Sequence, residues 1–214
     1  MENRNRNQQQ GAEFRSKQQN APDDKEDCCR NQQQKPRFRA RDEEEVVLCI
    51  RDLSTPSFYP SMVSLWVSDS FERKNMERSL LAQLIVNLSK RHDCLISRSQ
   101  LVEGFESVLS TLEEAVTDVP KAAEFLGYFF GKVIAENLVP LREIGKLIRE
   151  GGEQPGSLVD AGLGSEILGN ILEFVKMEKG DSFLNEIRTS SNLRLDDFRP
   201  PYSSAKTKKL DAFL

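Results

Sequence analysis

The sequence predicts an all-α protein, a HEAT-like α-solenoid of stacked antiparallel helix pairs that follows a disordered polar N-terminal tail. From residue 42 onward, apolar residues recur three and four positions apart, the spacing that places them on one face of a helix. No stretch shows the alternation of apolar and polar residues that is typical of a half-buried strand. Proline and glycine interrupt the helical pattern at short intervals, and amphipathic helices joined by short turns are typical of stacked helix pairs, although no strict sequence period is visible.

Residues 1–41 differ from the rest of the chain. They are rich in Gln, Asn and Arg and contain ten basic and six acidic side chains, so this tail carries +4 and the remaining residues carry −8 of the overall −4. Such a segment buries too little apolar surface to offset the entropy lost on ordering, and we expect it to be disordered. Arg37, Arg39 and Arg41, with Phe38 among them, have the composition to contact RNA phosphates and stack on a base, but a solvated basic linker is the favoured interpretation.

The folded domain is expected to span residues 42–190, and residues 191–214 are expected to form a mostly irregular C-terminal tail. Asp42 to Glu45 place acidic side chains in the first turn of the first helix, where they interact favourably with its dipole. Glycines and a proline between residues 151 and 164 argue against regular structure there, and Gly180 is expected to end a helix. The apolar stripes of the expected helices are Val46–Leu53, Met62–Phe71, Leu80–Leu88, Leu101–Val116, Ala122–Ile134, Leu141–Ile148, Ile167–Val175 and Phe183–Ile187.

Residues 97–137 have the clearest helical pattern and are expected to form a helix, a short acidic connection and a second helix. Ser97 and Gln100 have the spacing of a capping box at the start of the first helix. Gly127 and Gly131 recur on the apolar face of the second helix, where they leave room for a close neighbouring helix. The two helices are therefore expected to pack as an antiparallel hairpin.

The acidic connection between these helices contains Glu113, Glu114 and Asp118. Asp118 stands where it would cap the second helix, with Pro120 in the first turn, a position that tolerates proline. Glu113 and Glu114 adjoin each other on an expected exposed helix end, so a solvated acidic surface is a simpler interpretation than an acid/base pair.

The sequence contains no recognisable catalytic or cofactor site. Its single histidine, His92, lies in a polar turn, so a Ser/His or Cys/His pair has only one candidate base. Neither a GxxxxGK[ST] nor a GxGxxG phosphate loop occurs, and the cysteines include no CxxC pair that would indicate zinc. We therefore predict a protein that is not an enzyme and binds no metal and no cofactor. The cysteines are Cys28, Cys29, Cys49 and Cys94.

No apolar run in the sequence is long enough to cross a membrane, and the first residues lack the pattern of a secretory signal. We therefore expect a cytoplasmic protein whose thiols stay reduced. The negative charge that follows the tail repels phosphate, so the expected main partner of the folded domain is another protein.

Several segments of the chain, taken in their order along the sequence, resemble segments of the MA3 domain over about residues 42–202. They include the run Ser64–Lys74 and the turn Asp118–Ala122, which is specific only together with its flanking helices. Pro56–Val63, Leu80–Leu88 and the pair Gly104–Phe105 also resemble this family. The family helix that would precede residue 42 is replaced here by a polar segment, so we expect a truncated form with exposed apolar surface on the helix that contains Val46–Leu53.

The resemblance implies a non-enzymatic translation initiation module that docks the DEAD-box RNA helicase of the initiation factor 4A class. In the family, the acidic turn before the second helix of the central stretch contacts the helicase, which here corresponds to Glu114, Asp118 and Pro120, with Glu113 and Val119 beside them. A further family contact is an acidic residue at the end of the second helix, where this chain has Ser68 followed by Asp69.

Three alternatives remain open at the level of the sequence. A capping role alone, with Glu113 and Glu114 as surface acids, is one alternative for Asp118, and both roles can also hold together. A free-standing MA3 domain is also suited to sequester the helicase and repress translation. Binding of mRNA by the basic tail is the third alternative, and its test is removal of residues 1–41.

Overall fold

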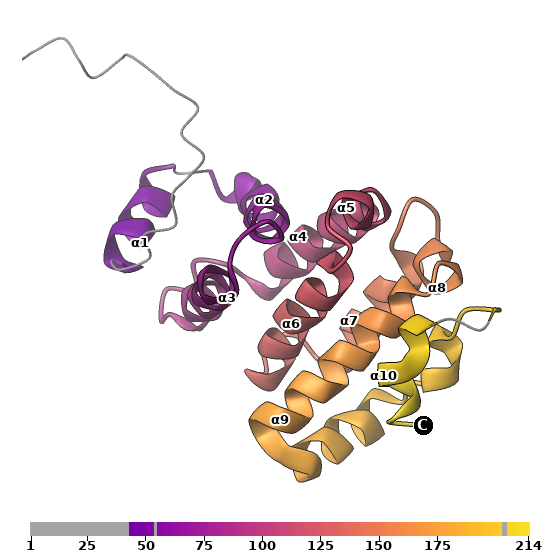
Figure 1. Cartoon of the computed structure of the whole chain (residues 1–214). Coiled ribbons are helices and arrows are strands. Elements are labelled where there is room, and N and C mark those ends of the chain that lie inside the picture. Colours follow the sequence, from indigo (N-terminus) through magenta and orange to yellow (C-terminus); the bar gives the residue numbers. More distant parts are fainter. Residues whose placement is uncertain (1–42, 54, 203–204) are drawn as a thin grey trace, which may run out of the picture. The chain divides into compact units, whose positions relative to one another are not determined.

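The computed structural model describes residues 43–53, 55–202 and 205–214. The predicted tail, including Arg37, Arg39 and Arg41, lies outside these residues. Every regular element in the described part of the chain is helical, which confirms the predicted all-α fold of stacked helix pairs (Figure 1). The α-helices are α1 Glu43–Asp52, α2 Tyr59–Ser70, α3 Asn75–Lys90, α4 Arg98–Ser110, α5 Leu112–Asp118, α6 Ala122–Ala135, α7 Leu141–Glu150, α8 Ser157–Asp160, α9 Leu163–Ser191 and α10 Lys208–Asp211. Short 3₁₀ helices are η1 Pro56–Phe58, η2 Leu195–Phe198 and η3 Ala205–Thr207.

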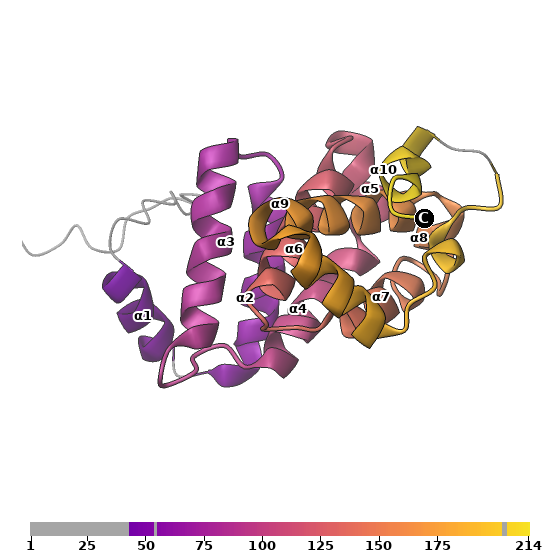
Figure 2. The ribbon, with the colours of Figure 1, turned by 90° about the horizontal axis from the view of Figure 1, so that it is seen from below.

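Two helix pairs make the most extensive contacts, α2 with α4 and α6 with α9 (Figure 1 and Figure 2). Glycines permit both close approaches. A Cβ atom added to Gly104 of α4 would lie 2.8 Å from the carbonyl oxygen of Pro60 in α2. Added to Gly127 and Gly131 of α6, a Cβ would lie 2.7 Å from the Cβ of Asn170 and 2.7 Å from the ring of Phe174, both on α9.

The partner of α6 therefore differs from the expected hairpin. The face of α6 that carries Gly127 and Gly131 packs against α9 and not against α4. Helices α7 and α8 separate α6 from α9 in the chain. Helices α4 and α6 still meet in the core, where the rings of Phe105 and Phe130 pack edge to face with centroids 4.9 Å apart. The room predicted at Gly127 and Gly131 is confirmed, and it accommodates α9.

The connection between α4 and α6 is itself a helix. In α5, Leu112 is fully buried and Ala115 and Val116 pack partly against the core, as does Val119 directly after the helix, at helical spacing. Asp118 is the last residue of α5 and does not cap α6, so the predicted cap is wrong. The residue before α6 is Lys121, which makes no side-chain capping bond.

Other local predictions are confirmed. The backbone N–H of Ser97 donates to Gln100 Oε1 over 2.9 Å, and the N–H of Gln100 donates to Ser97 Oγ over 3.3 Å. Gly180 has φ 86° and ψ 174°, which breaks α9 into two helical parts at the predicted residue. The glycine-rich segment after residue 151 contains one short helix, α8, where no regular structure was expected.

The hydrophobic core is continuous from Val47 of α1 to Leu210 of α10. The segment after residue 191 contributes to it, because Phe198 and Leu210 are fully buried and Leu195 is nearly so. Within α1, Val47 and Ile50 are buried, whereas Leu48 is 57% exposed and Leu53, directly after the helix, is 51% exposed, so the expected exposed apolar surface is present at this helix.

Candidate docking site

A groove of about 220 Å³ lies between the C-terminal end of α2 and helix α5. Its floor is apolar and its rim is polar and acidic. Phe71, Ala115 and Val119 form the floor, and Phe71 is 95% buried by the core. The residues that line the rim are Ser68, Glu72, Thr111, Glu114 and Asp118.

Three carboxylates line this groove, and none of them forms a hydrogen bond or an ion pair with another described residue. Glu114 and Asp118 are exposed, and no hydrogen bond or ion pair connects either of them to another described residue. Glu72 is exposed as well and lies in the turn that follows α2. The pKa of the Arg73 guanidinium is raised mainly by Asp69, and the charge of Glu72 adds a smaller contribution in the same direction. An apolar floor ringed by solvated negative charge suits a partner with a basic, partly apolar surface.

Asp118 is placed against the local preference of its helix. It is the last residue of α5, and the negative end of the helix dipole lies there, so a carboxylate at this position is unfavourable for the helix. Local rules of this kind are broken mainly at functional or strained sites. The position of Asp118 therefore gives its carboxylate no stabilising role in α5.

The predicted site residues do not all meet in the groove. Glu114, Asp118 and Val119 line it together. Pro120 is exposed directly after them, in the turn to α6. Glu113 points elsewhere, because its carboxylate accepts hydrogen bonds from the Glu153 N–H over 2.9 Å and from Ser157 Oγ over 2.8 Å. Glu113 thus holds the loop before α8.

The end of α2 contributes a different acid from the one expected. The Asp69 carboxylate accepts hydrogen bonds from Arg73 Nη2 over 2.7 Å and Nε over 3.1 Å, which raise the pKa of Arg73, and Asp69 does not line the groove. Glu72 lines it instead, together with Ser68. The signal in the sequence is the spacing of four residues from Ser68, which places Glu72 on the same side of the turn.

A buried arginine fixes the turn that contains Glu72. Arg78 of α3 is 4% exposed, and its Nη2 donates to the carbonyl oxygens of Arg73 over 2.7 Å and Phe71 over 3.3 Å. Its guanidinium carbon lies 3.4 Å from the centroid of the Phe125 ring of α6. Burial lowers the pKa of Arg78. The arginine therefore connects the acidic turn after α2 to α6.

The described part of the chain offers no alternative centre for metal chemistry. Among these residues, no group of three or more His, Cys, Asp or Glu side chains is arranged to hold a metal ion. None of the described helices combines the length and the hydropathy that crossing a membrane requires. The chemistry available at the groove is charge pairing and apolar contact.

Comparison with known proteins finds one family model and two groups of relatives that are similar to this chain. Residues 37–140 match the MA3 domain. Eukaryotic translation initiation factor 4G of Triticum aestivum is 55% identical over 177 residues, which cover 83% of this chain and 12% of that protein. The factor of the same name from Arabidopsis thaliana is 54% identical over 176 residues, which cover 82% of this chain and 10% of that protein.

A second group of relatives is more distant. MA3 domain-containing translation regulatory factor 1 of Arabidopsis thaliana is 27% identical over 105 residues, which cover 49% of this chain and 14% of that protein. The chain spans about a tenth of the length of the initiation factors that it matches. Residues 37–140 of this chain match the MA3 domain family, and over most of its own length the chain is similar to one segment of plant eukaryotic translation initiation factor 4G.

Proposed function

We propose that this chain is a non-enzymatic module of translation initiation that docks a DEAD-box RNA helicase of the initiation factor 4A class in the cytoplasm. The observation that supports this most directly is the groove between α2 and α5, where the unpaired carboxylates of Glu72, Glu114 and Asp118 surround an apolar floor. The similarity to initiation factor 4G agrees with a role in translation initiation.

In the proposed mechanism, the carboxylates of the groove contribute both to the approach of the helicase and to the bound complex. Their negative charge steers a basic surface of the helicase toward the groove and then pairs with its lysine or arginine side chains. Val119 and the exposed Pro120 pack against apolar groups beside these pairs and exclude water from them. Complex formation is therefore expected to weaken as salt concentration rises.

The test is calorimetric titration of the helicase with the parent chain and with Asp118→Asn. The substitution keeps the size of the side chain and removes its charge, so the fold is retained. We expect the affinity to fall about tenfold, a loss of about 1.4 kcal/mol. Stability should stay equal or rise by about 0.3–1 kcal/mol, because a charge that opposes the helix dipole is removed.

Asp52→Asn is the matched control. Asp52 is likewise the exposed last residue of a helix, α1, but it does not line the groove. Its variant should bind the helicase as the parent does. Equal binding by the parent and Asp118→Asn would remove Asp118 from the site, and absence of binding by the parent would refute the proposed function.

The similarity to MA3 domain-containing translation regulatory factors supports a second candidate function, in which the same groove sequesters the helicase and represses translation. Addition of the purified chain to a translation extract distinguishes the two. A repressor lowers protein output, and Asp118→Asn should restore that output. An initiation module leaves the output unchanged or raises it.

A further inference from the structure

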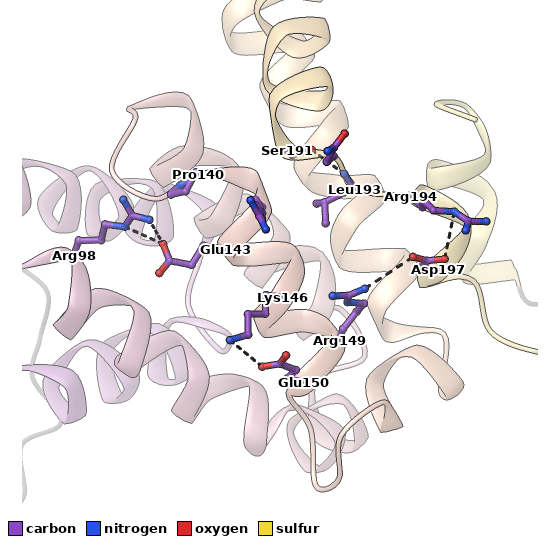
Figure 3. A pocket seen from close by; sticks show the side chains of 12 residues that line it. Arg98, Pro140, Glu143, Lys146, Arg149, Glu150, Ser191, Leu193, Arg194 and Asp197 are labelled. Atoms are coloured by element: carbon purple, nitrogen blue, oxygen red, sulfur yellow. Dashed lines mark hydrogen bonds and ion pairs between the residues drawn. The ribbon is translucent and has the colours of Figure 1, made fainter.

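A second and larger groove, of about 550 Å³, is rich in cations (Figure 3). It lies along α7 and is closed by the start of α4 and by the segment that connects α9 to η2. Its charged residues outnumber its apolar ones. The lining residues are Arg98, Pro140, Arg142, Glu143, Lys146, Arg149, Glu150, Ser191, Asn192, Leu193, Arg194 and Asp197.

Helix α7 supplies the central row of cations. Arg142, Lys146 and Arg149 are spaced four and three residues apart, which places them along one exposed side of the helix. The opposite side is fixed by the core, in which Ile144 and Ile148 are fully buried. Seven residues of helix rise by about 10 Å, so the three side chains form a row of about that length.

Two more arginines extend the row, Arg98 from α4 and Arg194 from the segment after α9. Five cations and three carboxylates give the groove a net charge of +2. The residues after the N-terminal tail carry −8 in total. The groove is therefore a local positive region within an acidic domain, and the repulsion expected between the folded domain and phosphate does not apply there.

The carboxylates of the groove hold these cations loosely. The Lys146–Glu150, Arg149–Asp197 and Arg194–Asp197 pairs have nitrogen–oxygen distances of 3.6, 3.9 and 3.8 Å, beyond hydrogen-bond length (Figure 3). Exposed pairs of this kind contribute little to stability, so another anion can replace their carboxylates at little cost. Arg98 pairs with Glu143 more closely.

Arg142 is the one cation of the groove for which the described residues provide no ion-pair partner. Its side chain is exposed next to the other two cations of α7. A guanidinium in this state presents all its donors to a ligand, and its planar fork matches the oxygens of a phosphate.

We propose that this groove binds the phosphate backbone of single-stranded RNA. A row of cations matches a strand of regularly spaced negative charges, and release of counterions from that strand provides affinity without apolar contact. An acidic protein segment fits less well, because protein interfaces depend on buried apolar or aromatic anchors, and the groove offers only Pro140 and Leu193.

The residues that line the groove do not allow it to distinguish one RNA sequence from another. None of the described residues that line it is aromatic, so it has no ring on which a base could stack. Contacts to phosphate position a strand without distinguishing its sequence. Binding is therefore expected to be independent of base sequence and strongly dependent on salt.

The test is fluorescence anisotropy of a labelled, unstructured oligouridylate with the full chain over a series of salt concentrations. The groove variant is Arg142→Gln/Lys146→Gln. For single strands, the logarithm of the association constant falls with the logarithm of salt by about 0.7 per phosphate contact, so loss of two contacts should reduce this slope by about 1.4. Far-UV circular dichroism checks that the variants remain helical.

The matched control is Lys121→Gln/Lys176→Gln, which removes two charges from exposed positions outside the groove. It should bind as the parent does. The variant Arg37→Gln/Arg39→Gln/Arg41→Gln measures what the tail contributes. Because the assay contains no helicase, its result is independent of the proposed docking function.

Four results would overturn the proposal: no binding of the oligonucleotide by the parent, equal slopes for the groove variant and the control, loss of all binding in the tail variant alone, or stronger binding of polyglutamate than of RNA at the groove. The last result would assign the groove to an acidic protein segment.

Discussion

The close contact between α6 and α9 leads to a quantitative prediction for Gly127→Ala. The added Cβ would lie 2.7 Å from the Cβ of Asn170 and 3.0 Å from the carbonyl oxygen of Ile167, where carbon atoms normally approach to about 3.5–4.0 Å. Both opposing atoms are fixed to the backbone of α9, so the helices must separate. Overpacking of this kind costs up to about 3 kcal/mol, and the higher helix propensity of alanine returns about 1 kcal/mol.

The expected net loss is about 2 kcal/mol, measured by urea denaturation followed by far-UV circular dichroism. Gly145→Ala in α7 is the matched control. There, the added Cβ meets Leu193 Cδ1 at 2.5 Å, the far end of a flexible side chain that can rotate away. Its steric cost should be close to the gain in propensity. If Gly127→Ala were as stable as the parent, or more stable than Gly145→Ala, the close packing of α6 on α9 would be refuted.

Three further changes test other contacts. Arg78→Met should lower the free energy of unfolding, measured by urea denaturation, by about 3 kcal/mol, because buried carbonyl oxygens lose a charged hydrogen-bond donor. The ion pairs of Glu136 with Lys90 and Lys179 lower the pKa of its carboxyl, so their stabilisation is present above the ordinary pKa and lost as the pH falls through the lowered value. Thermal denaturation should therefore find Glu136→Gln less stable than the parent, by at most about 1 kcal/mol, at neutral pH, and equal to it in acid. Glu113→Ala should speed amide hydrogen exchange at the loop before α8, and unchanged exchange there would contradict the anchoring role of this carboxylate.

The local features of the fold follow from the sequence because their causes are local. The capping box at Ser97 and the break of α9 at Gly180 depend on residues a few positions apart or on one residue. The partner of α6 could not be predicted in this way. Gly127 and Gly131 indicate that another helix packs closely on α6. The residues of that helix that meet them, Asn170 and Phe174, lie about forty positions later and show no special pattern in the sequence.

The candidate site was predicted in part for the same reason. Glu114 and Asp118 belong to one short segment, and their grouping is visible in the sequence. Glu72 joins them only because α2 ends beside α5, which is a consequence of tertiary packing. The cap predicted for Asp118 failed because the apolar spacing from Leu112 to Val119 continues a helix through the acidic residues.

Because α6 packs closely on α9, the end of the family match and the end of the folded core fall at different residues. The family match ends at residue 140, before α9 begins at Leu163. A recombinant fragment that ended with the match would keep every family residue but leave the glycine face of α6 and its apolar neighbours in contact with water. The unit that must be expressed together to bury this core is therefore longer than the segment that matches the family, and it extends through the buried Leu210.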